Sequence, residues 1–290
     1  MAPPLPHIYL NGEVVPLADA RISVLDRGFL FGDGVYEVIP VFGGQPLRLD
    51  EHVARLDRSL DVTDMPALSG IASWQKLVRR MVGLNGGGDM SVYIQVTRGV
   101  GPDRDHRFPS GTPPTVLVMC QPAPGRLPGI DTEGIAAIVC HDPRWARCDI
   151  KATSLLANVL MRQQAADEDA AEAIMVKDGL VTEGAASSVF IYDGSTLKTP
   201  PNSPLILPGI TRDLVIELAK ADGIPIRIEA FTPDEMRVAN EVMLASSVRE
   251  IVPVCRIDGV AVGGGAPGPV WSRIDARYQA FKQTLRESAA

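Results

Sequence analysis

Hydrophobic and polar residues alternate in some segments of the chain and repeat at helical spacing in others. Residues 92–97 alternate between aliphatic and polar or aromatic side chains, which predicts a half-buried strand. In 50–60 the aliphatic residues recur every three or four positions, and a second such segment covers 71–84. Both are predicted to be helices, the first capped by Asp50. Two short apolar runs joined at Asn11-Gly12 predict a hairpin.

The rest of the chain carries further short apolar segments of the same two kinds. Strands are predicted at 115–120, 134–141, 173–177 and 241–244, and helices at 155–160, 208–221 and 268–286. No internal repeat is present. Strands paired by hairpins, with helices between them, predict an α+β protein.

A proline- and glycine-rich segment, QPAPGRLPG at 121–129, interrupts this pattern. Such a composition cannot continue a helix or a central strand, so the segment is predicted to be an interdomain linker. It divides the chain into a small N-terminal domain, 1–120, and a larger C-terminal domain, 130–290.

Composition and charge narrow the class of function. The net charge is −7 and no long basic run occurs, which argues against nucleic acid or an anionic membrane as a partner. No apolar stretch approaches the roughly 20 residues of a membrane span. The scattered cysteines form no CxxC pair, so neither a metal site nor a disulfide framework is predicted. We expect a cytoplasmic protein that acts on a small molecule.

Two charged residues have the chemistry of a catalytic site if they are sheltered from water. Lys151 lies directly before a predicted helix, and a lysine that attacks an aldehyde needs the lowered pKa that burial gives. Glu183 follows a predicted turn at Asp178-Gly179, and a carboxylate there can keep a pyridine nitrogen protonated. Considered one at a time, Lys151 is equally consistent with a solvated surface lysine, and Glu183 with an exposed glutamate in a turn.

Three positions have the chemistry of a phosphate site. The helix predicted to begin within 208–211 offers unpaired N–H groups at the positive end of its dipole. Ser246 and Ser247 place two hydroxyls after a predicted strand, and Arg55 has the guanidinium fork that matches phosphate. An ordinary helix start, a strand-end turn and a surface charge are the respective alternatives.

A polar loop, GVGPDRDHRFP at 99–109, contains Arg104-Asp105-His106. A loop tip with this composition can bind a substrate carboxylate, and a solvated loop is the alternative. The sequence shows no Ser-His-Asp set, no HExxH motif and no GxGxxG motif after a predicted strand.

Blocks of sequence in one fixed order resemble the fold-type IV (class IV) pyridoxal-phosphate-dependent aminotransferases. They are DRGFLFGDGVYEV (26–38), YIQVTRG (93–99), RWARCDIK (144–151), VTEG (181–184) and GITRD (209–213). The resemblance covers nearly the whole chain and is strongest to the D-amino-acid aminotransferases of bacteria. It implies their two-domain α+β fold, with a small N-terminal α/β domain and a larger β-rich C-terminal domain flanked by helices.

The resemblance implies pyridoxal 5′-phosphate as cofactor and gives each candidate residue a role. Lys151 corresponds to the catalytic lysine, which forms a Schiff base with the cofactor and later moves the substrate proton. Glu183 corresponds to the carboxylate on the pyridine nitrogen. The phosphate-binding group corresponds to Arg55, Ile210, Thr211, Ser246 and Ser247.

Three further residues correspond to the substrate-binding group of the family: Tyr36, Arg104 and His106. The Arg-x-His pattern of the D-specific members grips the substrate α-carboxylate from the neighbouring subunit, which implies a homodimer with shared active sites. The implied substrates are D-amino acids such as D-alanine, with 2-oxoglutarate or pyruvate as the acceptor.

Related enzymes on the same scaffold remain alternatives, namely branched-chain L-amino-acid transaminases, (R)-amine transaminases and aminodeoxychorismate lyase. Three departures from the family pattern concern substrate preference. The 99–109 loop is one residue longer, the serine-rich stretch after VTEG is replaced by 185–188 (AASS), and Val248-Arg249 follow the serine pair.

Overall fold

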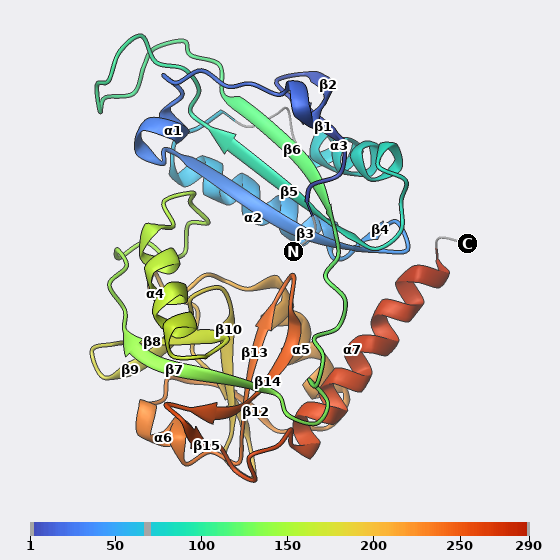
Figure 1. The fold of residues 1–290 in the computed structure, drawn as a ribbon, viewed down its shortest axis with the longest axis vertical. Helices are drawn as coiled ribbons and strands as arrows, with labels where there is room; N and C mark the ends of the chain where they lie inside the picture. Colours follow the sequence, from blue (N-terminus) through green and yellow to red (C-terminus); the bar gives the residue numbers. More distant parts are fainter. Residues whose placement is uncertain (1–2, 67–70, 289–290) are drawn as a thin grey trace. The chain divides into compact units, whose positions relative to one another are not determined.

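A computed structural model describes residues 3–66 and 71–288, which form two compact units (Figure 1). The first unit comprises 1–124, 150–154 and 283–290, and the second comprises 125–149 and 155–282. The chain therefore returns to the first unit twice, at 150–154 and at 283–290. A single linker at 121–129 between two continuous domains would not include these two segments. The sequence-based domain boundaries stay a prediction, while the predicted α+β class is confirmed.

The first unit contains an antiparallel sheet with the strand order β2-β1-β6-β5-β3-β4. Its strands are β1 (His7–Leu10), β2 (Glu13–Pro16), β3 (Gly34–Phe42), β4 (Gln45–Pro46), β5 (Met90–Thr97) and β6 (Thr115–Pro122). The predicted β1–β2 hairpin is confirmed, and its turn residues Asn11 and Gly12 both have positive φ. Between β2 and β3 lie a 3-10 turn, η1 (Leu17–Asp19), and a short helix, α1 (Arg27–Phe31), which the sequence pattern did not predict.

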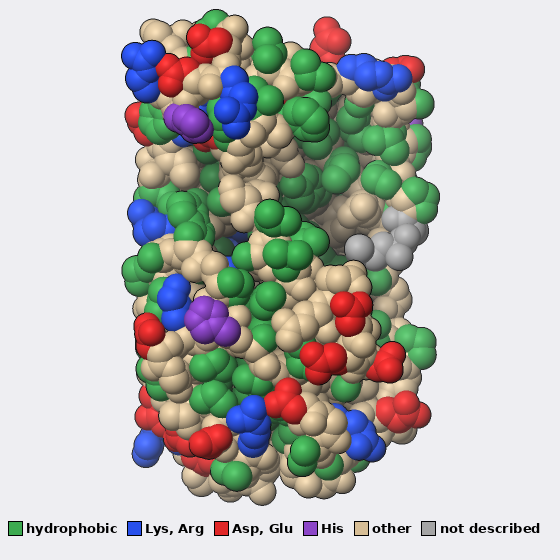
Figure 2. Space-filling model, turned by 60° about the vertical axis from the view of Figure 1, so that its left-hand side comes forward, with side chains coloured by type: hydrophobic (Ala, Val, Ile, Leu, Met, Phe, Trp, Pro, Cys, Tyr) green, Lys and Arg blue, Asp and Glu red, His purple; other side chains and the backbone are tan. Residues whose placement is uncertain are grey.

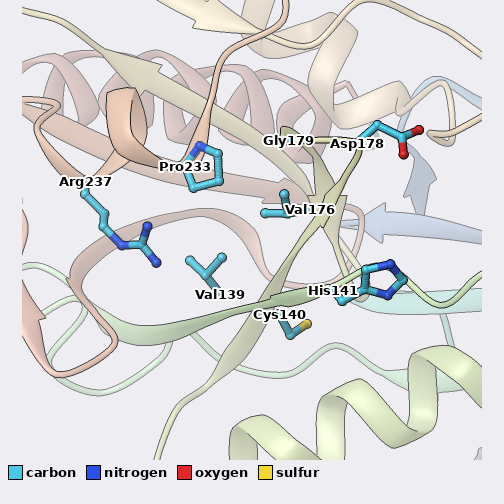
Figure 3. A pocket seen from close by; sticks show the side chains of 8 residues that line it. All are labelled: Val139, Cys140, His141, Val176, Asp178, Gly179, Pro233 and Arg237. Atoms are coloured by element: carbon cyan, nitrogen blue, oxygen red, sulfur yellow. The ribbon is translucent and has the colours of Figure 1, made fainter.

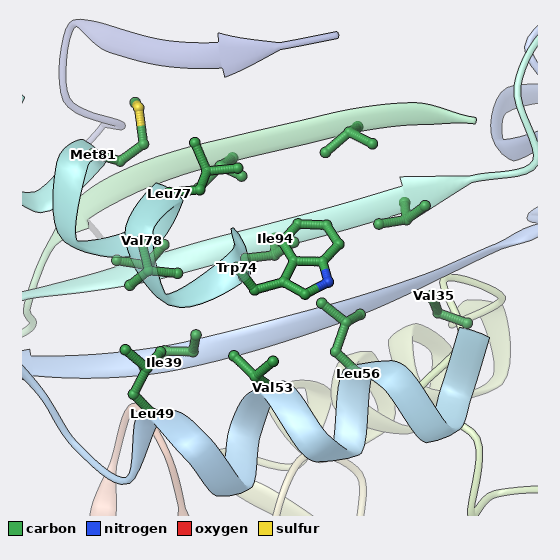
Figure 4. Packing of buried hydrophobic residues seen from close by; sticks show 14 of the residues in the cluster. Val35, Ile39, Leu49, Val53, Leu56, Trp74, Leu77, Val78, Met81 and Ile94 are labelled. Atoms are coloured by element: carbon green, nitrogen blue, oxygen red, sulfur yellow. The ribbon is translucent and has the colours of Figure 1, made fainter. Parts of the chain in front are cut away.

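Two amphipathic helices, α2 (Leu49–Val62) and α3 (Ile71–Leu84), pack on one face of this sheet. Figure 4 shows Val53, Leu56 and Trp74 of these helices against Ile39 and Ile94 of the strands. All five side chains are fully buried, so this layer is the core of the unit.

The start of α2 differs from the prediction. Arg48, in the left-handed conformation with φ 47°, precedes the helix, and Asp50 lies inside its first turn. The expected Asp50 cap is therefore wrong. An acidic residue in the first turn still favours the helix through its dipole.

The second unit contains a mixed sheet with the strand order β12-β11-β10-β13-β14-β7-β8-β9, to which β15 adds beside β14. Its strands are β7 (Ile135–His141), β8 (Glu172–Lys177), β9 (Leu180–Gly184), β10 (Ser188–Tyr192), β11 (Leu197–Thr199), β12 (Ile226–Ile228), β13 (Glu241–Ser246), β14 (Glu250–Ile257) and β15 (Val260–Ala261). Its helices are α4 (Leu156–Asp167), α5 (Ile210–Ala221), α6 (Pro233–Arg237) and α7 (Pro269–Glu287), whose last turn belongs to the first unit.

The apolar stripe of α4 does not enter the core of its unit. Leu156 is 73% exposed, Val159 58% and Leu160 55%, whereas Ala165 is buried. The helix was predicted from these leucines and valine, and the helix exists, but its apolar side is open. Across 3–66 and 71–288, no helix combines the length and the apolar character needed to cross a bilayer.

Candidate functional site

Lys151 lies on an extended segment that runs along the edge of β3. The backbone N–H of Tyr36 donates to the carbonyl of Lys151 at 2.9 Å, and the N–H of Thr153 donates to the carbonyl of Gly34 at 2.9 Å. These bonds fix the backbone on both sides of the lysine. Its side chain is half-buried, and Nζ lies 4.2 Å from the centre of the Tyr36 ring. The backbone hydrogen bonds and the contact with the Tyr36 ring therefore restrain Lys151, which is not a freely rotating surface cation.

The same face of the sheet carries a polar aromatic group next to this lysine. Tyr36 pairs in register with Gln95, and its ring centre lies 5.6 Å from that of Tyr93. The Tyr93 hydroxyl donates to Gln95 Oε1 at 2.7 Å. Burial, with Tyr36 close by, raises the pKa of Tyr93 to about 12, so its hydroxyl stays neutral at physiological pH.

Arg55 is not the surface charge that was the alternative for it, because only 3% of it is exposed. Glu37, on the opposite face of β3 from Tyr36, points into the layer covered by α2. There Arg55 Nε donates to Glu37 Oε1 at 2.6 Å, and His52 Nδ1 lies 2.8 Å from Glu37 Oε2. Burial acts to raise the pKa of Glu37, but the Arg55 charge and the His52 hydrogen bond hold it well below its ordinary value.

Replacing Glu37 with glutamine is expected to lower the free energy of unfolding by about 3–5 kcal/mol at pH 7, because the buried Arg55 charge loses its partner. The pKa of Glu37 is lower in the folded protein than its ordinary 4.5. Its contribution is therefore complete above about pH 4.5 and is lost as the pH falls through the folded-state pKa. The difference from the wild type should shrink below pH 4.5, as urea unfolding at fixed protein and cofactor concentration can measure.

The matched control for this prediction is Glu51→Gln, since Glu51 is half-exposed in the first turn of the same helix. Its effect should stay within about 0.5 kcal/mol at every pH. Equal effects of the two substitutions at pH 7 would show that the buried ion pair of Glu37 and Arg55 contributes nothing specific.

Glu183 lies in the middle of a buried set of charges in the second unit. It belongs to β9 and is 6% exposed, so it is not an exposed turn residue. Its Oε1 accepts a short hydrogen bond from Arg144, and its Oε2 accepts one from the N–H of Leu207 at 3.1 Å. Arg144 also binds Asp142, with Nη2 2.7 Å from Oδ2. Burial acts to lower the pKa of Arg144, but the two carboxylates raise it above its ordinary value, so the guanidinium stays charged beside Glu183.

The start of α5 lies close to this carboxylate and to the end of β13. Leu207, which binds Glu183, is two residues before Gly209, the residue that precedes α5. A Cβ on Gly209 would lie 2.7 Å from Ser188 Oγ, and Ser188 pairs in register with Ala245, next to Ser246. The fold thereby brings Glu183, the first N–H groups of α5 and the Ser246-Ser247 turn into one region of the unit.

This region fits a phosphate group. The first N–H groups of a helix have no acceptor within the helix, and Gly209 supplies no side-chain cap to α5. The hydroxyl of Thr211 is buried and has no hydrogen-bond partner within the described chain. A buried hydroxyl of this kind costs about 1–3 kcal/mol unless something binds it. A phosphate at the start of α5 would accept from both Thr211 and the backbone.

The predicted substrate loop joins β5 to β6 in the first unit. Arg104 and His106 are exposed on it, and both lie against Phe31 of α1. The distances to the Phe31 ring centre are 5.2 Å from the Arg104 guanidinium and 5.2 Å from the His106 ring. The loop therefore presents the two side chains together.

A surface hollow elsewhere in the second unit contains none of the predicted site residues. Figure 3 shows it between β7, the β8–β9 turn and α6. Its lining includes Val139, Cys140 and His141 on one side and Arg237 on the other, and Arg237 is already paired with Asp258 at 2.8 Å. No group of three or more metal-binding side chains occurs among the described residues, here or elsewhere.

Comparison with known proteins agrees with this geometry. The family model described as amino-transferase class IV matches residues 34–257. The chain belongs to the class IV aminotransferase family. The family is one of pyridoxal-phosphate enzymes, so the predictions of a transaminase and of this cofactor are confirmed.

Several relatives of this aminotransferase match over nearly their full length. It is 38% identical to D-alanine aminotransferase from Bacillus licheniformis over 94% of this chain and 95% of that protein. It is also 38% identical to D-alanine aminotransferase from Listeria monocytogenes over 92% and 93% of the two chains. Among solved structures, it resembles branched-chain amino acid aminotransferase from Escherichia coli with a TM-score of 0.90, 28% identity and coverage of 95% and 94%.

Several residues of the candidate site were not singled out from the sequence. Arg144 binds Glu183 and is itself bound by Asp142, while Glu37 binds both Arg55 and His52. Arg144 lies in RWARCDIK and Glu37 in GDGVYEV, so both lie within or beside the blocks that carried the resemblance. The alternation of the strand could have identified Glu37, because positions 35, 37 and 39 point to the same side. Val35 and Ile39 on that side are buried, so Glu37 is expected to be buried with them.

Proposed function

We propose that this aminotransferase moves the amino group of D-amino acids such as D-alanine to a 2-oxo acid, either 2-oxoglutarate or pyruvate. The observation that carries the proposal is the Arg104–His106 pair, gathered over Phe31 in a chain so similar to D-alanine aminotransferases. A guanidinium beside an imidazole suits an α-carboxylate. The loop would thus bind the α-carboxylate, which all amino-acid substrates share. The substrate side chain would contact other residues of the site.

The remaining residues take roles that follow from their surroundings. Pyridoxal 5′-phosphate, when bound, supplies the electron sink for the carbanion at the substrate Cα. Lys151 would take the proton from the substrate Cα onto its amine as general base and then release it as general acid. Glu183, bound by the Arg144 guanidinium, would hold a proton on the pyridine nitrogen.

The phosphate would be bound at the start of α5 and by the nearby hydroxyls. Ile210 and Thr211 supply backbone N–H groups, and Thr211 adds its unpartnered hydroxyl. Ser246 and Ser247 complete this side. Arg55, in α2, is a further proposed phosphate-binding residue. Tyr36, whose ring lies under the Lys151 amine, borders the substrate.

We also propose a homodimer in which each subunit lends its Arg104 loop to the other. Apolar side chains are exposed around that loop, with Phe29 at 67% and Phe108 at 58%. The open stripe of α4, including Leu156, is a second such surface, and Figure 2 shows hydrophobic side chains reaching the surface on one face. Sedimentation should give twice the 31.1 kDa mass of one chain, and a monomer with full activity would contradict shared sites.

A second candidate is the transamination of branched-chain L-amino acids. The fold similarity to the Escherichia coli branched-chain enzyme favours it, with a TM-score of 0.90. The two candidates differ in the hand of the substrate at Cα, which sets the side of the cofactor from which its side chain projects.

A paired steady-state assay separates the two candidates. D-alanine and L-leucine are each supplied with 2-oxoglutarate, and the 2-oxo acid products are measured. The proposal expects turnover of D-alanine at a kcat/KM at least about 100-fold above that for L-leucine, a difference of about 2.7 kcal/mol in transition-state binding. The opposite ratio would replace the proposal with the branched-chain function.

A further inference from the structure

A buried arginine in α1 holds the backbone of the Arg104–His106 loop. Arg27 is 4% exposed, and its Nη1 donates to the carbonyl of Asp105 at 2.6 Å. Its Nη2 donates to the carbonyl of His106 at 3.2 Å. One guanidinium thus binds two consecutive carbonyls, directly beside both predicted substrate-binding side chains.

Asp33 fixes this arginine and links it to a second one. Its Oδ2 accepts from Arg27 Nε at 2.8 Å and from Arg98 Nε at 2.9 Å. The Arg98 guanidinium lies 3.6 Å from the centre of the Phe108 ring, near the far end of the same loop. Two arginines joined by one carboxylate therefore hold the loop at residues 105–106 and at residue 108.

Phe31, one helical turn after Arg27, supplies the surface on which the loop side chains rest. The guanidinium of Arg27 lies 4.8 Å from its ring centre, in addition to the contacts of Arg104 and His106 with the same ring. Within the described chain no carboxylate pairs with Arg104, whereas its neighbour Arg107 is bound to Asp105. The charge of Arg104 is therefore left for an external anion.

We propose that Arg27 is a positioning residue for substrate carboxylate recognition, acting through the backbone of residues 105 and 106. This inference rests on the proposed role of Arg104 and His106. The segment between β5 and β6 has no helix or strand of its own, so ordering it on substrate binding would cost conformational entropy. By holding the loop in advance, Arg27 removes part of that cost from the binding step.

Arg27→Lys tests this inference because lysine keeps the charge toward Asp33 but cannot donate to both carbonyls in the fixed geometry of a guanidinium. The holoenzyme variant should show a KM for D-alanine raised by about 10-fold or more, the cost of losing a charge-assisted hydrogen bond, with kcat within about 3-fold of the wild type. Amide hydrogen exchange at 101–108 should quicken, while the cofactor content should stay unchanged. A KM and a loop exchange rate equal to those of the wild type would overturn the inference.

Two further variants keep the outcomes distinct. Arg286→Lys alters another arginine of the same unit, paired with Asp89 at the opposite end of β5, and should change neither KM nor exchange at 101–108. Arg104→Met tests the proposed function itself. If it raises the KM for D-alanine while Arg27→Lys does not, the positioning role is wrong and the proposed function stands. If Arg104→Met leaves KM unchanged, the carboxylate role of the loop is wrong and this inference falls with it.

Discussion

Replacing Lys151 with alanine is expected to reduce transamination by at least about 10⁴-fold. The substitution removes the amine that we propose to bind the cofactor covalently and to move the Cα proton, and general acid–base catalysis alone is worth about 10²–10⁴-fold. The measurement is kcat with D-alanine and 2-oxoglutarate on enzyme with matched cofactor content.

Lys76→Ala is the control, because Lys76 is an exposed lysine of α3 in the same unit. It should retain wild-type activity. Borohydride reduction followed by peptide mass analysis gives a readout besides activity. It should find the cofactor on residue 151 in the wild type and in Lys76→Ala, and not in Lys151→Ala. A Lys151→Ala variant with near-normal turnover would refute the catalytic assignment.

Replacing Glu183 with glutamine is expected to lower kcat by roughly 10²–10³-fold, the usual cost of losing one oriented charge-stabilising group. The amide keeps the size of the side chain and can still accept from the N–H of Leu207. It has no negative charge to hold a proton on the pyridine nitrogen, and it leaves Arg144 with one carboxylate partner in place of two. The measurement is kcat, together with the cofactor absorption spectrum, which should show a lowered pKa of the ring nitrogen.

Glu229→Gln is the control for this substitution. Glu229 is partly exposed and pairs with Lys198 at 3.1 Å, an arrangement worth little in water. Its kcat should match that of the wild type. If Glu183→Gln changed only the stability of the protein and left both kcat and the spectrum unaltered, Glu183 would be a structural residue.

Local sequence patterns predicted the strands and helices whose apolar residues enter a core. The strict alternation of 92–97 and the helical spacing of 71–84 correspond to β5 and α3. The same reasoning did not predict α1, because a five-residue helix within a glycine-rich segment has too little periodicity to detect. It predicted α4 but not the exposure of its apolar side, since spacing shows that a helix has an apolar face but not what covers that face.

The candidate site shows the same limit at the level of single side chains. The sequence motifs identified Lys151 and Glu183 as site residues. Judged from its local sequence alone, however, each was equally consistent with a solvated surface residue. What separates them is tertiary structure: the edge pairing of 150–154 with β3 and the burial of Glu183 beside Arg144. Such partners are distant in sequence, so local patterns cannot reveal them.

The departures from the family pattern are partly explained by the structure. Arg249 donates to the carbonyl of Ala171 at 2.9 Å, so its charge is held by the backbone of its own unit. The longer loop is held by Arg27 and Arg98. The Arg249 and Arg27 contacts could not be read from the sequence, because each joins residues 78 positions apart.

A single-turnover experiment with D-alanine tests the central claim most directly. Holoenzyme is mixed with D-alanine in the absence of any 2-oxo acid, and pyruvate is measured together with the cofactor absorbance. We expect one pyruvate for each active site, with conversion of the cofactor to its amine form, and no reaction with L-leucine. Conversion by L-leucine with no pyruvate from D-alanine would contradict it.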